Sequence, residues 1–255
     1  MSRIAPLAQV LDEATRLATP IPQLTLSDSL SEQDAYLLQS AAIQLRLSRG
    51  ERRIGVKMGF TSRAKMLQMG VDDMIWGRLT DGMLVDDGGR VSLGNFIHPR
   101  CEPEIAFLLK KDLPGLVTPL EALAAVEAVA PAIEIIDSRY QNFKFTLADV
   151  VADNCSSAGC VVGPWADPSQ ELGNLGMVLS FDGRAVQFGS SAAILGSPIR
   201  SLVAAARLSA AAGEPLRAGW IIMAGGATQA EPLLPGVHVR LEVESLGTVE
   251  FSVDG

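Results

Sequence analysis

The first fifty residues show apolar positions at helical spacing, separated by polar residues that favour the start of a helix. A first stretch is predicted to be helical because its apolar side chains recur every three or four residues, at Ile4, Leu7, Val10, Leu11 and Leu17. Cap-type residues between Ser27 and Ser31 precede a second predicted helix over Glu32–Arg49. We therefore expect a helical N-terminal region over residues 1–50.

Beyond residue 50 the pattern changes to short apolar runs broken by Gly, Pro and Asp, which is typical of β-strands. Two helices are predicted to interrupt them, one over Leu120–Val129 and one over Ile199–Ala212, the second preceded by a cap-type serine and a proline. Neither an internal repeat nor a regular strand–helix alternation is visible, which argues against a doubly wound nucleotide-binding fold. We expect a strand-rich body over 51–255 that carries the chemistry. Its predicted strands cover 54–60, 82–91, 103–111, 131–137, 177–183, 219–225 and 239–247.

The composition is that of an ordinary globular chain and favours a small-molecule partner. Of the 255 residues, 48% are hydrophobic and 20% are charged, and 21 basic against 29 acidic residues give a net charge of −8. Nucleic acids and anionic membrane surfaces require clustered Lys and Arg, so we expect neither as a partner. Three cysteines without a CxxC pair and two histidines argue against a disulfide scaffold and a zinc site, and favour a reducing, cytoplasmic setting. We see neither the apolar core of a signal peptide nor an apolar run long enough to cross a bilayer.

Three glutamates lie inside apolar runs, where a carboxylate is unexpected. Glu102 and Glu104 flank Pro103 at the start of a predicted strand, and because strand side chains alternate, both carboxylates project from one face. Glu134 lies in a second such run, PAIEIID. Acids of this kind are normally exposed, salt-bridged or bound to a cation, because an unpaired buried carboxylate is costly. Two interpretations stay open: a solvent-facing strand edge, which the pattern alone favours, and a three-carboxylate site for Mg²⁺ or Mn²⁺, cations that prefer oxygen ligands.

Other positions in the body also have two interpretations each. Lys57 interrupts an apolar strand, so either its side chain reaches the solvent, or its ammonium is buried with a pKa lowered toward neutrality, which suits proton transfer. Ser157 belongs to a polar cluster over 153–157 that is typical of a turn. Gly225 and Gly226 follow a strand, where they form either a tight turn or bare amides that approach a ligand carboxylate.

At these positions the chain is similar to a known family. The similarity is carried by KMGFTSRAKMLQMGV (57–71), HPRCEPEIAFLL (98–109), EIIDSRYQNFKF (134–145) and VVADNCSSAG (150–159), and it continues through LGSP, AGWIIMAGGAT and LGTVEFS. These runs resemble the 2-oxopentenoate hydratase and 4-oxalocrotonate decarboxylase family of the fumarylacetoacetate hydrolase-like superfamily. The resemblance implies an α+β fold, a mixed β-roll preceded by a helical N-terminal region. It also implies Mg²⁺ or Mn²⁺ as cofactor, a catalytic lysine and three metal ligands, here Lys57 and Glu102, Glu104 and Glu134.

One departure indicates the branch of the family. Its hydratases carry an aspartate directly before an aromatic-Gly pair, whereas this chain has Ile75 before Trp76 and Gly77. The resemblance therefore implies a carboxy-lyase that decarboxylates 2-oxo-3-hexenedioate to 2-hydroxypenta-2,4-dienoate and CO₂ in meta-cleavage catabolism of aromatic compounds. An apolar wall would suit the leaving carboxylate, because neutral CO₂ is favoured over an anion in a poorly solvated pocket. Substrate contacts are expected from Ile75, Trp76, Ser157, Gly225 and Gly226.

The nearest alternative is a 2-oxopent-4-enoate hydratase, which would share the fold and the metal site but add water. A C–C hydrolase of the fumarylacetoacetate type is less favoured, because a His/Glu pair that activates water is not evident. From another class, the chain could be a non-catalytic partner of a related hydratase, although the presence of Lys57 and all three glutamates argues against an inactive subunit. Because family members associate, we expect a homo-oligomer and a complex with the pathway hydratase.

Overall fold

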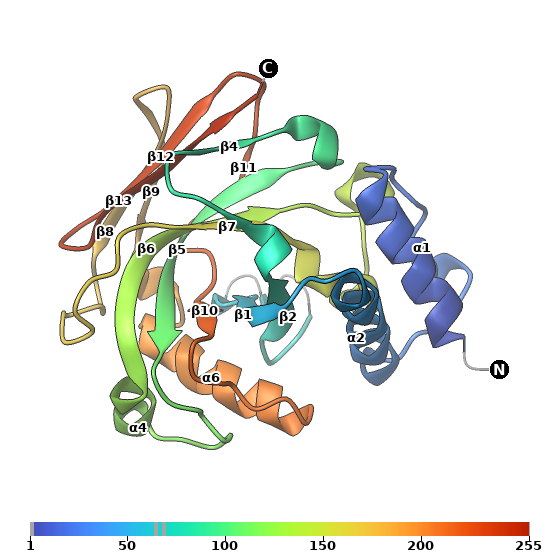
Figure 1. Ribbon diagram of the computed structural model, residues 1–255, viewed down its shortest axis with the longest axis horizontal. Helices are drawn as coiled ribbons and strands as arrows, with labels where there is room; N and C mark the ends of the chain where they lie inside the picture. Colours follow the sequence, from blue (N-terminus) through green and yellow to red (C-terminus); the bar gives the residue numbers. More distant parts are fainter. Residues whose placement is uncertain (1–2, 64–65, 68–69, 255) are drawn as a thin grey trace.

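The computed structural model describes residues 3–63, 66–67 and 70–254. The first two residues, residue 255 and four residues of the 57–71 motif lie outside the described residues. The described chain forms two β-sheets, with helices packed around them at separate places (Figure 1). The α+β class predicted from the sequence is confirmed. Within these ranges, no helix is long and apolar enough to cross a membrane.

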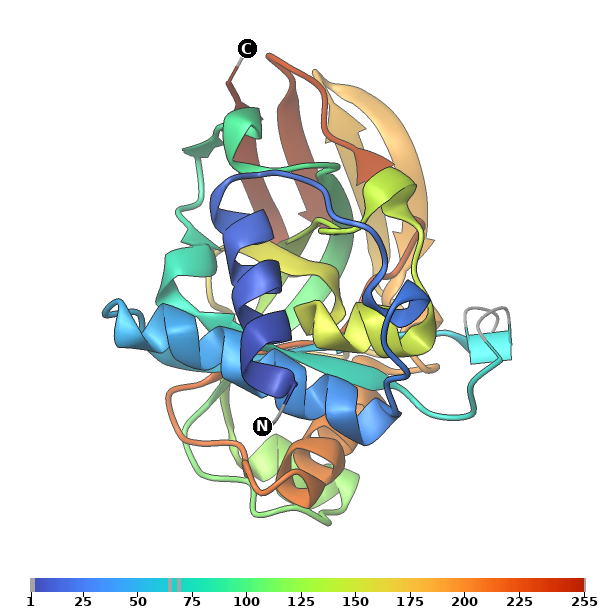
Figure 2. The same ribbon diagram turned by 90° about the vertical axis from the view of Figure 1, so that its right-hand side faces the viewer.

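Two helices, α1 (Ile4–Arg16) and α2 (Glu32–Ser48), pack against each other on one side of the molecule (Figure 2). Helix α2 begins with a capping box, in which the side chains of Ser31 and Asp34 each accept a hydrogen bond from the other residue's backbone amide. The apolar faces of both helices share a buried cluster with α5 (Leu147–Ala152). That cluster joins side chains from both sides of residue 50, and the division of the chain there stays a prediction.

The strands form two sheets of mixed orientation. In the larger sheet the order is β2-β1-β10-β5-β6-β7-β3, with β11 paired to the start of β5, and in the smaller sheet it is β4-β13-β12-β8-β9. The pairs β1–β10, β3–β7 and β4–β13 are parallel, whereas the other neighbours are antiparallel. The strands are β1 (Arg53–Gly59), β2 (Ile75–Thr80), β3 (Leu84–Val85), β4 (Gly89–Val91), β5 (Arg100–Leu109), β6 (Val126–Ile136), β7 (Ser157–Val162), β8 (Gly176–Phe181), β9 (Arg184–Ser190), β10 (Ile221–Met223), β11 (Glu231–Pro232), β12 (His238–Val243) and β13 (Gly247–Val253).

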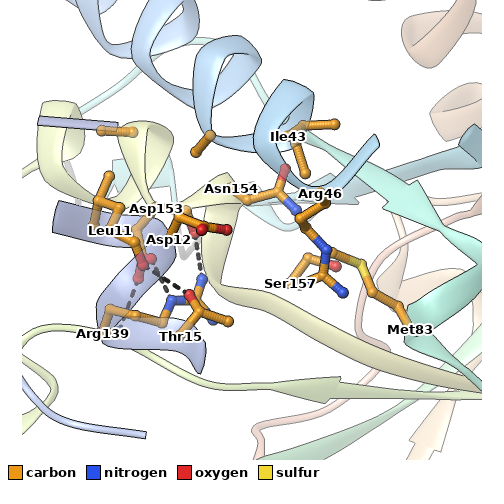
Figure 3. Close-up of a pocket in the computed structure, with 12 residues that line it drawn as sticks. Leu11, Asp12, Thr15, Ile43, Arg46, Met83, Arg139, Asp153, Asn154 and Ser157 are labelled. Carbon is orange, nitrogen blue, oxygen red and sulfur yellow. Dashed lines mark hydrogen bonds and ion pairs between the residues drawn. The ribbon is translucent and has the colours of Figure 1, made fainter. Parts of the chain in front are cut away.

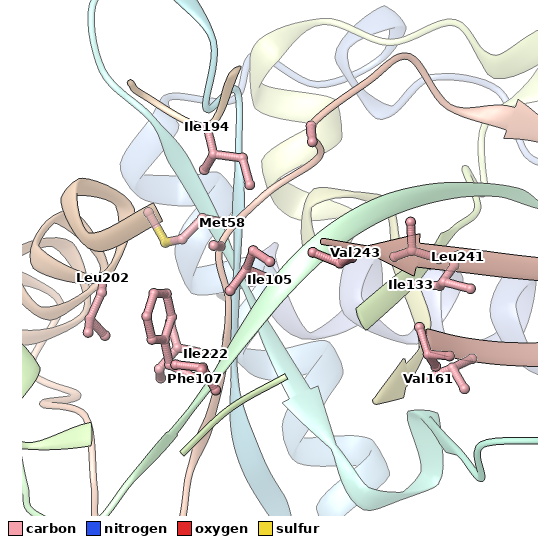
Figure 4. Close-up of a cluster of buried hydrophobic side chains, with 14 of the residues drawn as sticks. Met58, Ile105, Phe107, Ile133, Val161, Ile194, Leu202, Ile222, Leu241 and Val243 are labelled. Carbon is pink, nitrogen blue, oxygen red and sulfur yellow. The ribbon is translucent and has the colours of Figure 1, made fainter. Parts of the chain in front are cut away.

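The two long strands β5 and β6 lie side by side in the larger sheet and are buried at both ends. Toward one end the smaller sheet packs on them, so that Ile133 and Leu241 belong to the same apolar cluster (Figure 4). Toward the other end helix α6 (Pro198–Ala211) covers the sheet and brings Leu202 close to Phe107 and Ile222 (Figure 4). Burial of apolar surface at both ends fixes these strands, which also carry the three glutamates.

One predicted helix is wrong in its second half. Helix α4 (Pro119–Ala124) starts at a capping box between Thr118 and Glu121, as the pattern predicts, but it ends before the predicted Val129. The chain continues instead as β6, in which Val129 pairs with Phe107 of β5. The β-branched residues of this segment gain more from pairing with distant strands than from extending a local helix. The predicted helix over Ile199–Ala212 is confirmed as α6, to within one residue at each end.

Candidate active site

The three glutamates meet on one face of the β5–β6 pair. Glu102 lies directly opposite Glu134 in the antiparallel register, and Glu104 lies two residues further along the same face of β5. All three side chains are buried, with exposed fractions of 7% for Glu102, 0% for Glu104 and 1% for Glu134. A solvent-facing strand edge is therefore the wrong interpretation. The alternation of strand side chains brings three carboxylates into the interior together.

Lys57 reaches the same cluster from β1. Its Nζ lies 2.9 Å from Glu134 Oε2 and donates a hydrogen bond of 3.0 Å to the carbonyl oxygen of Cys155. The side chain is buried, so extension to the solvent is ruled out. Burial alone would lower the pKa of Lys57, but the charges of Glu134 and the other nearby acids outweigh it and raise that pKa above its ordinary value. The expected lowering of the pKa is wrong, because the sequence pattern did not place these carboxylates beside the ammonium.

The cluster holds more negative than positive charge. Burial raises the pKa of Glu104 well above its ordinary value, and the charge of Glu134 raises it further. Burial also raises the pKa of Glu134, although the neighbouring Lys57 opposes this shift. Glu104 Oε1 and Glu134 Oε1 are buried, and neither accepts a hydrogen bond from the described residues. Within the part of the chain that the structure describes, Glu104 and Glu134 therefore lack a hydrogen-bond donor at these two oxygens.

These features fit a divalent cation with oxygen ligands. Among the described residues, no three His, Cys, Asp or Glu side chains already enclose a metal position. The fit rests instead on the two unpartnered carboxylate oxygens, on the charge deficit and on a donor set of carboxylates alone. Hard cations such as Mg²⁺ and Mn²⁺ prefer such ligands, and Mg²⁺ keeps part of its shell for water or substrate oxygens.

Gly225 and Gly226 fit closely against the carboxylates. The amide of Gly225 donates a hydrogen bond of 2.7 Å to Glu104 Oε2, and its φ of +103° lies in the region that favours glycine. A Cβ at Gly225 would overlap the Thr61 side chain, and one at Gly226 would overlap the Glu102 carboxylate. The two glycines thus allow the backbone to approach and orient the glutamates. Gly226 also lines the cavity described next.

A cavity of about 210 Å³ opens beside the cluster. Glu102, Glu134 and Lys57 supply its charged wall, and Ile75 belongs to its apolar wall. It shares Glu102 and Gly226 with a neighbouring, wider cavity that extends toward Arg100. The side chains and glycines that complete its lining are Met58, Gly59, Phe60, Thr61, Ile136, Phe143, Phe145, Val150, Cys155, Ser156 and Gly226. A lining that combines charged and apolar side chains suits a substrate with an anionic head and a conjugated chain.

Three of the predicted substrate contacts lie outside this cavity, and one of them is Gly225, whose amide binds Glu104 instead. Trp76 is buried and stacks on Tyr36 of α2, with ring centroids 5.7 Å apart. Ser157 lies on the wall of a separate groove between α1, α2 and the body (Figure 3). The preceding residue, Ser156, lines the cavity instead, and its buried Oγ has no hydrogen-bond partner among the described residues. The polar run over 153–157 indicated this segment, although not which serine faces the cavity.

The groove in Figure 3 holds charges that are paired. A buried ion pair joins Arg139 to Asp153 (Figure 3). Nearby, Arg49, the residue that follows α2, donates two hydrogen bonds to Asp12 of α1. Burial raises the pKa of Asp153 to about 6, against the opposing effect of Arg139. Near pH 7 the carboxylate is therefore ionised and paired with the guanidinium.

Known proteins resemble the chain in sequence and in fold. Residues 61–254 match the fumarylacetoacetate (FAA) hydrolase C-terminal family. Over 253 residues the chain is 60% identical to a 4-oxalocrotonate decarboxylase from Pseudomonas sp., with 99% of each chain covered. It is 37% identical to a 2-keto-4-pentenoate hydratase from Paraburkholderia xenovorans, covering 95% of this chain and 91% of the relative.

A solved structure agrees with these sequence matches. The 4-oxalocrotonate decarboxylase from Pseudomonas putida G7, complexed with magnesium and adipate, superposes with a TM-score of 0.96 and 38% identity, covering 99% of this chain and 98% of that one. The mixed-sheet fold expected from the sequence motifs is confirmed. The chain belongs to the fumarylacetoacetate hydrolase family, in the group that contains the 4-oxalocrotonate decarboxylases and 2-keto-4-pentenoate hydratases.

Proposed function

We propose that the chain is a metal-dependent 2-oxo-3-hexenedioate (4-oxalocrotonate) decarboxylase, a carboxy-lyase of aromatic-compound catabolism. The observation that carries this proposal is the buried cluster of Lys57, Glu102, Glu104 and Glu134, of which all but Glu104 line the cavity. The closer sequence match to a decarboxylase than to a hydratase supports the same choice. The products are 2-hydroxypenta-2,4-dienoate and CO₂.

Each charged side chain has a role in this proposal. Glu102, Glu104 and Glu134 hold Mg²⁺ or Mn²⁺, and Gly225 orients Glu104 through its amide. The bound cation supplies a Lewis acid that stabilises negative charge as it develops on the 2-oxo oxygen. Lys57, held between Glu134 and the Cys155 carbonyl, donates a hydrogen bond to that oxygen and can deliver its proton.

The reaction moves one electron pair along the conjugated chain. The bond to the distal carboxylate breaks and CO₂ leaves. The electron pair of that bond moves through the double bond to the 2-oxo oxygen, where a proton completes the enol product. Ile75 and the other apolar lining disfavour an anionic carboxylate relative to neutral CO₂.

Ile75 also separates this proposal from the hydratase alternative. The side chain is buried on the cavity wall, at the position where hydratases of the resembling family carry an aspartate. Addition of water requires a group that moves protons, and isoleucine supplies none. Decarboxylation requires no such group there, so the apolar wall favours it.

Purified protein incubated with 2-oxo-3-hexenedioate, with and without Mg²⁺, tests the proposal. We expect release of CO₂ and formation of 2-hydroxypenta-2,4-dienoate that stop in chelator and return with Mg²⁺ or Mn²⁺. Conversion of 2-hydroxypenta-2,4-dienoate into 4-hydroxy-2-oxopentanoate without any CO₂ release would favour the hydratase. Absence of both reactions would favour a non-catalytic partner.

The setting and partners belong to the same proposal. Three buried cysteines, all free thiols, support a reducing cytoplasmic compartment. We further propose that the chain self-associates and binds the hydratase that consumes its product, and the exposed Phe188 on edge strand β9 supports contact with another chain. Sedimentation of the chain alone, and of its mixture with the hydratase, tests these two associations.

A further inference from the structure

The segment that precedes β7 adopts an uncommon backbone conformation. Asn154, Cys155 and Ser156 have φ angles of 50°, 52° and 59°, and thus form three consecutive left-handed residues of which none is glycine. Residues with a Cβ rarely occupy this region, and then usually singly. Such a conformation persists only where surrounding contacts impose it, and it occurs preferentially at functional sites.

The Asn154 side chain supplies the contacts that hold this turn. Its Oδ1 accepts a hydrogen bond of 2.7 Å from the backbone amide of Arg78, and its Nδ2 donates one of 2.9 Å to the carbonyl of the same residue. The side-chain amide thus bonds to β2 as a neighbouring strand would. A Cβ at Gly77 would lie 2.5 Å from the Asn154 carbonyl oxygen, so the turn packs directly against bare backbone. Cys155 adds a hydrogen bond from its thiol to the Trp76 carbonyl.

The turn points two groups toward the carboxylate cluster. Its Cys155 carbonyl accepts the 3.0 Å hydrogen bond from Lys57 Nζ, and Ser156 lines the cavity. Lys57 therefore lies between Glu134 on one strand and a strained turn on another segment. Without the turn, Glu134 alone would orient the ammonium, and a single ion pair leaves a lysine several rotamers.

We propose that Asn154 is a positioning residue for Lys57: by bonding both ways to the backbone of Arg78, it holds the left-handed turn whose Cys155 carbonyl fixes the ammonium in the cavity. Asn154 itself does not line the cavity, and it acts through the turn. This inference rests on the proposed function in one respect, namely the role of Lys57 as donor to the 2-oxo oxygen.

The first test compares Asn154→Gly with the wild type in steady-state kinetics. Glycine adopts the left-handed backbone without strain but removes both hydrogen bonds to Arg78. We expect kcat for CO₂ release to fall at least about tenfold, because small displacements of a catalytic group have large effects on rate. KM and the Kd for Mn²⁺ should stay within about threefold of the wild type, because the variant leaves the carboxylates in place.

Asp182→Gly is the matched control. Asp182 is also left-handed, with a φ of 49°, and its carboxylate accepts a hydrogen bond from the His238 amide in an exposed turn of the smaller sheet. The Asp182→Gly variant thus loses one side-chain hydrogen bond at a left-handed position away from the cavity, and its kcat should be unchanged. A wild-type kcat in folded Asn154→Gly would overturn the proposal. So would a joint loss of kcat, substrate binding and Mn²⁺ binding, which would indicate general damage.

The second test needs no turnover. Reductive methylation with formaldehyde, followed by peptide mass spectrometry, measures how fast Lys57 reacts relative to the exposed Lys110 of the same chain. We expect this ratio to rise at least about tenfold in Asn154→Gly, because the ammonium loses a fixed acceptor. An unchanged ratio would overturn the proposal, whether or not the wild type is active toward 2-oxo-3-hexenedioate. Inactivity of the wild type would count against the proposed function alone. If Asn154→Gly does not fold, Asn154→Asp, which keeps the acceptor for the Arg78 amide and loses the donor, undergoes both tests with the same expectations.

Discussion

Two charged regions of the molecule differ in how their charges are balanced. In the groove between the N-terminal helices and the body, Arg139 is paired with Asp153 and Arg49 with Asp12. Beside the cavity, three glutamates lie around Lys57, and two of their carboxylate oxygens have no hydrogen-bond partner among the described residues. Balanced pairs hold the structure together. The unbalanced cluster lowers the stability of the folded chain. In return it provides a site for a cation and an anionic substrate.

The largest expected effect is on turnover, in Lys57→Ala. Removing the ammonium takes away the donor beside Glu134 and should lower kcat by about 10³-fold, within the range seen for loss of a positioned acid or base. Circular dichroism should show an intact fold. Near-wild-type turnover would show that Lys57 has a purely structural role. The carboxylate cluster would then no longer differ from the groove in function.

Asp153→Ala should affect stability instead. It leaves the Arg139 guanidinium buried without its carboxylate, and such a loss typically costs about 3–5 kcal/mol of unfolding free energy. Urea denaturation at pH 7 measures this cost. The Kd for Mn²⁺ should remain at the wild-type value in the folded fraction, so a variant that unfolded normally but lost Mn²⁺ would contradict the separation of the two regions.

Glu104→Gln should show the opposite behaviour. Loss of one carboxylate is expected to weaken Mn²⁺ binding about 100-fold and to lower turnover with it. Because the substitution removes one uncompensated buried charge, the metal-free protein should be no less stable than the wild type. Calorimetric titration with Mn²⁺ and urea denaturation in chelator measure the two effects. Unchanged Mn²⁺ affinity would exclude Glu104 from the metal site.

The smallest expected effect is on the pH dependence of stability. The folded-state pKa of Asp153 is raised from 3.8 to about 6, so between these values the folded chain retains a proton that the unfolded chain has lost. The contribution of Asp153 to the free energy of unfolding therefore falls as pH rises through this window, by no more than about 3 kcal/mol. Urea denaturation of the wild type and of Asp153→Asn at pH 4.5 and pH 7 measures this effect. The wild type should be more stable relative to the variant at pH 4.5 than at pH 7. A shift in the other direction would show that Arg139 outweighs burial.

Local sequence pattern was sufficient to identify the carboxylates as candidates. Alternation along β5 predicts that Glu102 and Glu104 share a face, and the register of β5 and β6 brings Glu134 to the same face. Pattern did not show that this face is interior, since burial there depends on elements distant in sequence. The raised pKa of Lys57 depends on the same distant carboxylates.

Other features were missed because backbone geometry or long-range packing decided them. The left-handed turn interrupts strand alternation, so Ser156 rather than Ser157 faces the cavity. Trp76 packs against Tyr36 of α2, a contact between segments that local pattern does not relate. The predicted helix over Leu120–Val129 fails for a similar reason, because pairing of β6 with β5 outweighs local preference.

The position of β10 within the larger sheet has a consequence for the order in which the site forms during synthesis. β5 and β6 are joined through one short helix, and their pairing brings the three glutamates together early. β1, which carries Lys57, does not pair with β5, because β10 (Ile221–Met223) lies between them. All three glutamates are thus translated before residues 221–223, the strand through which β1 and its lysine are joined to β5.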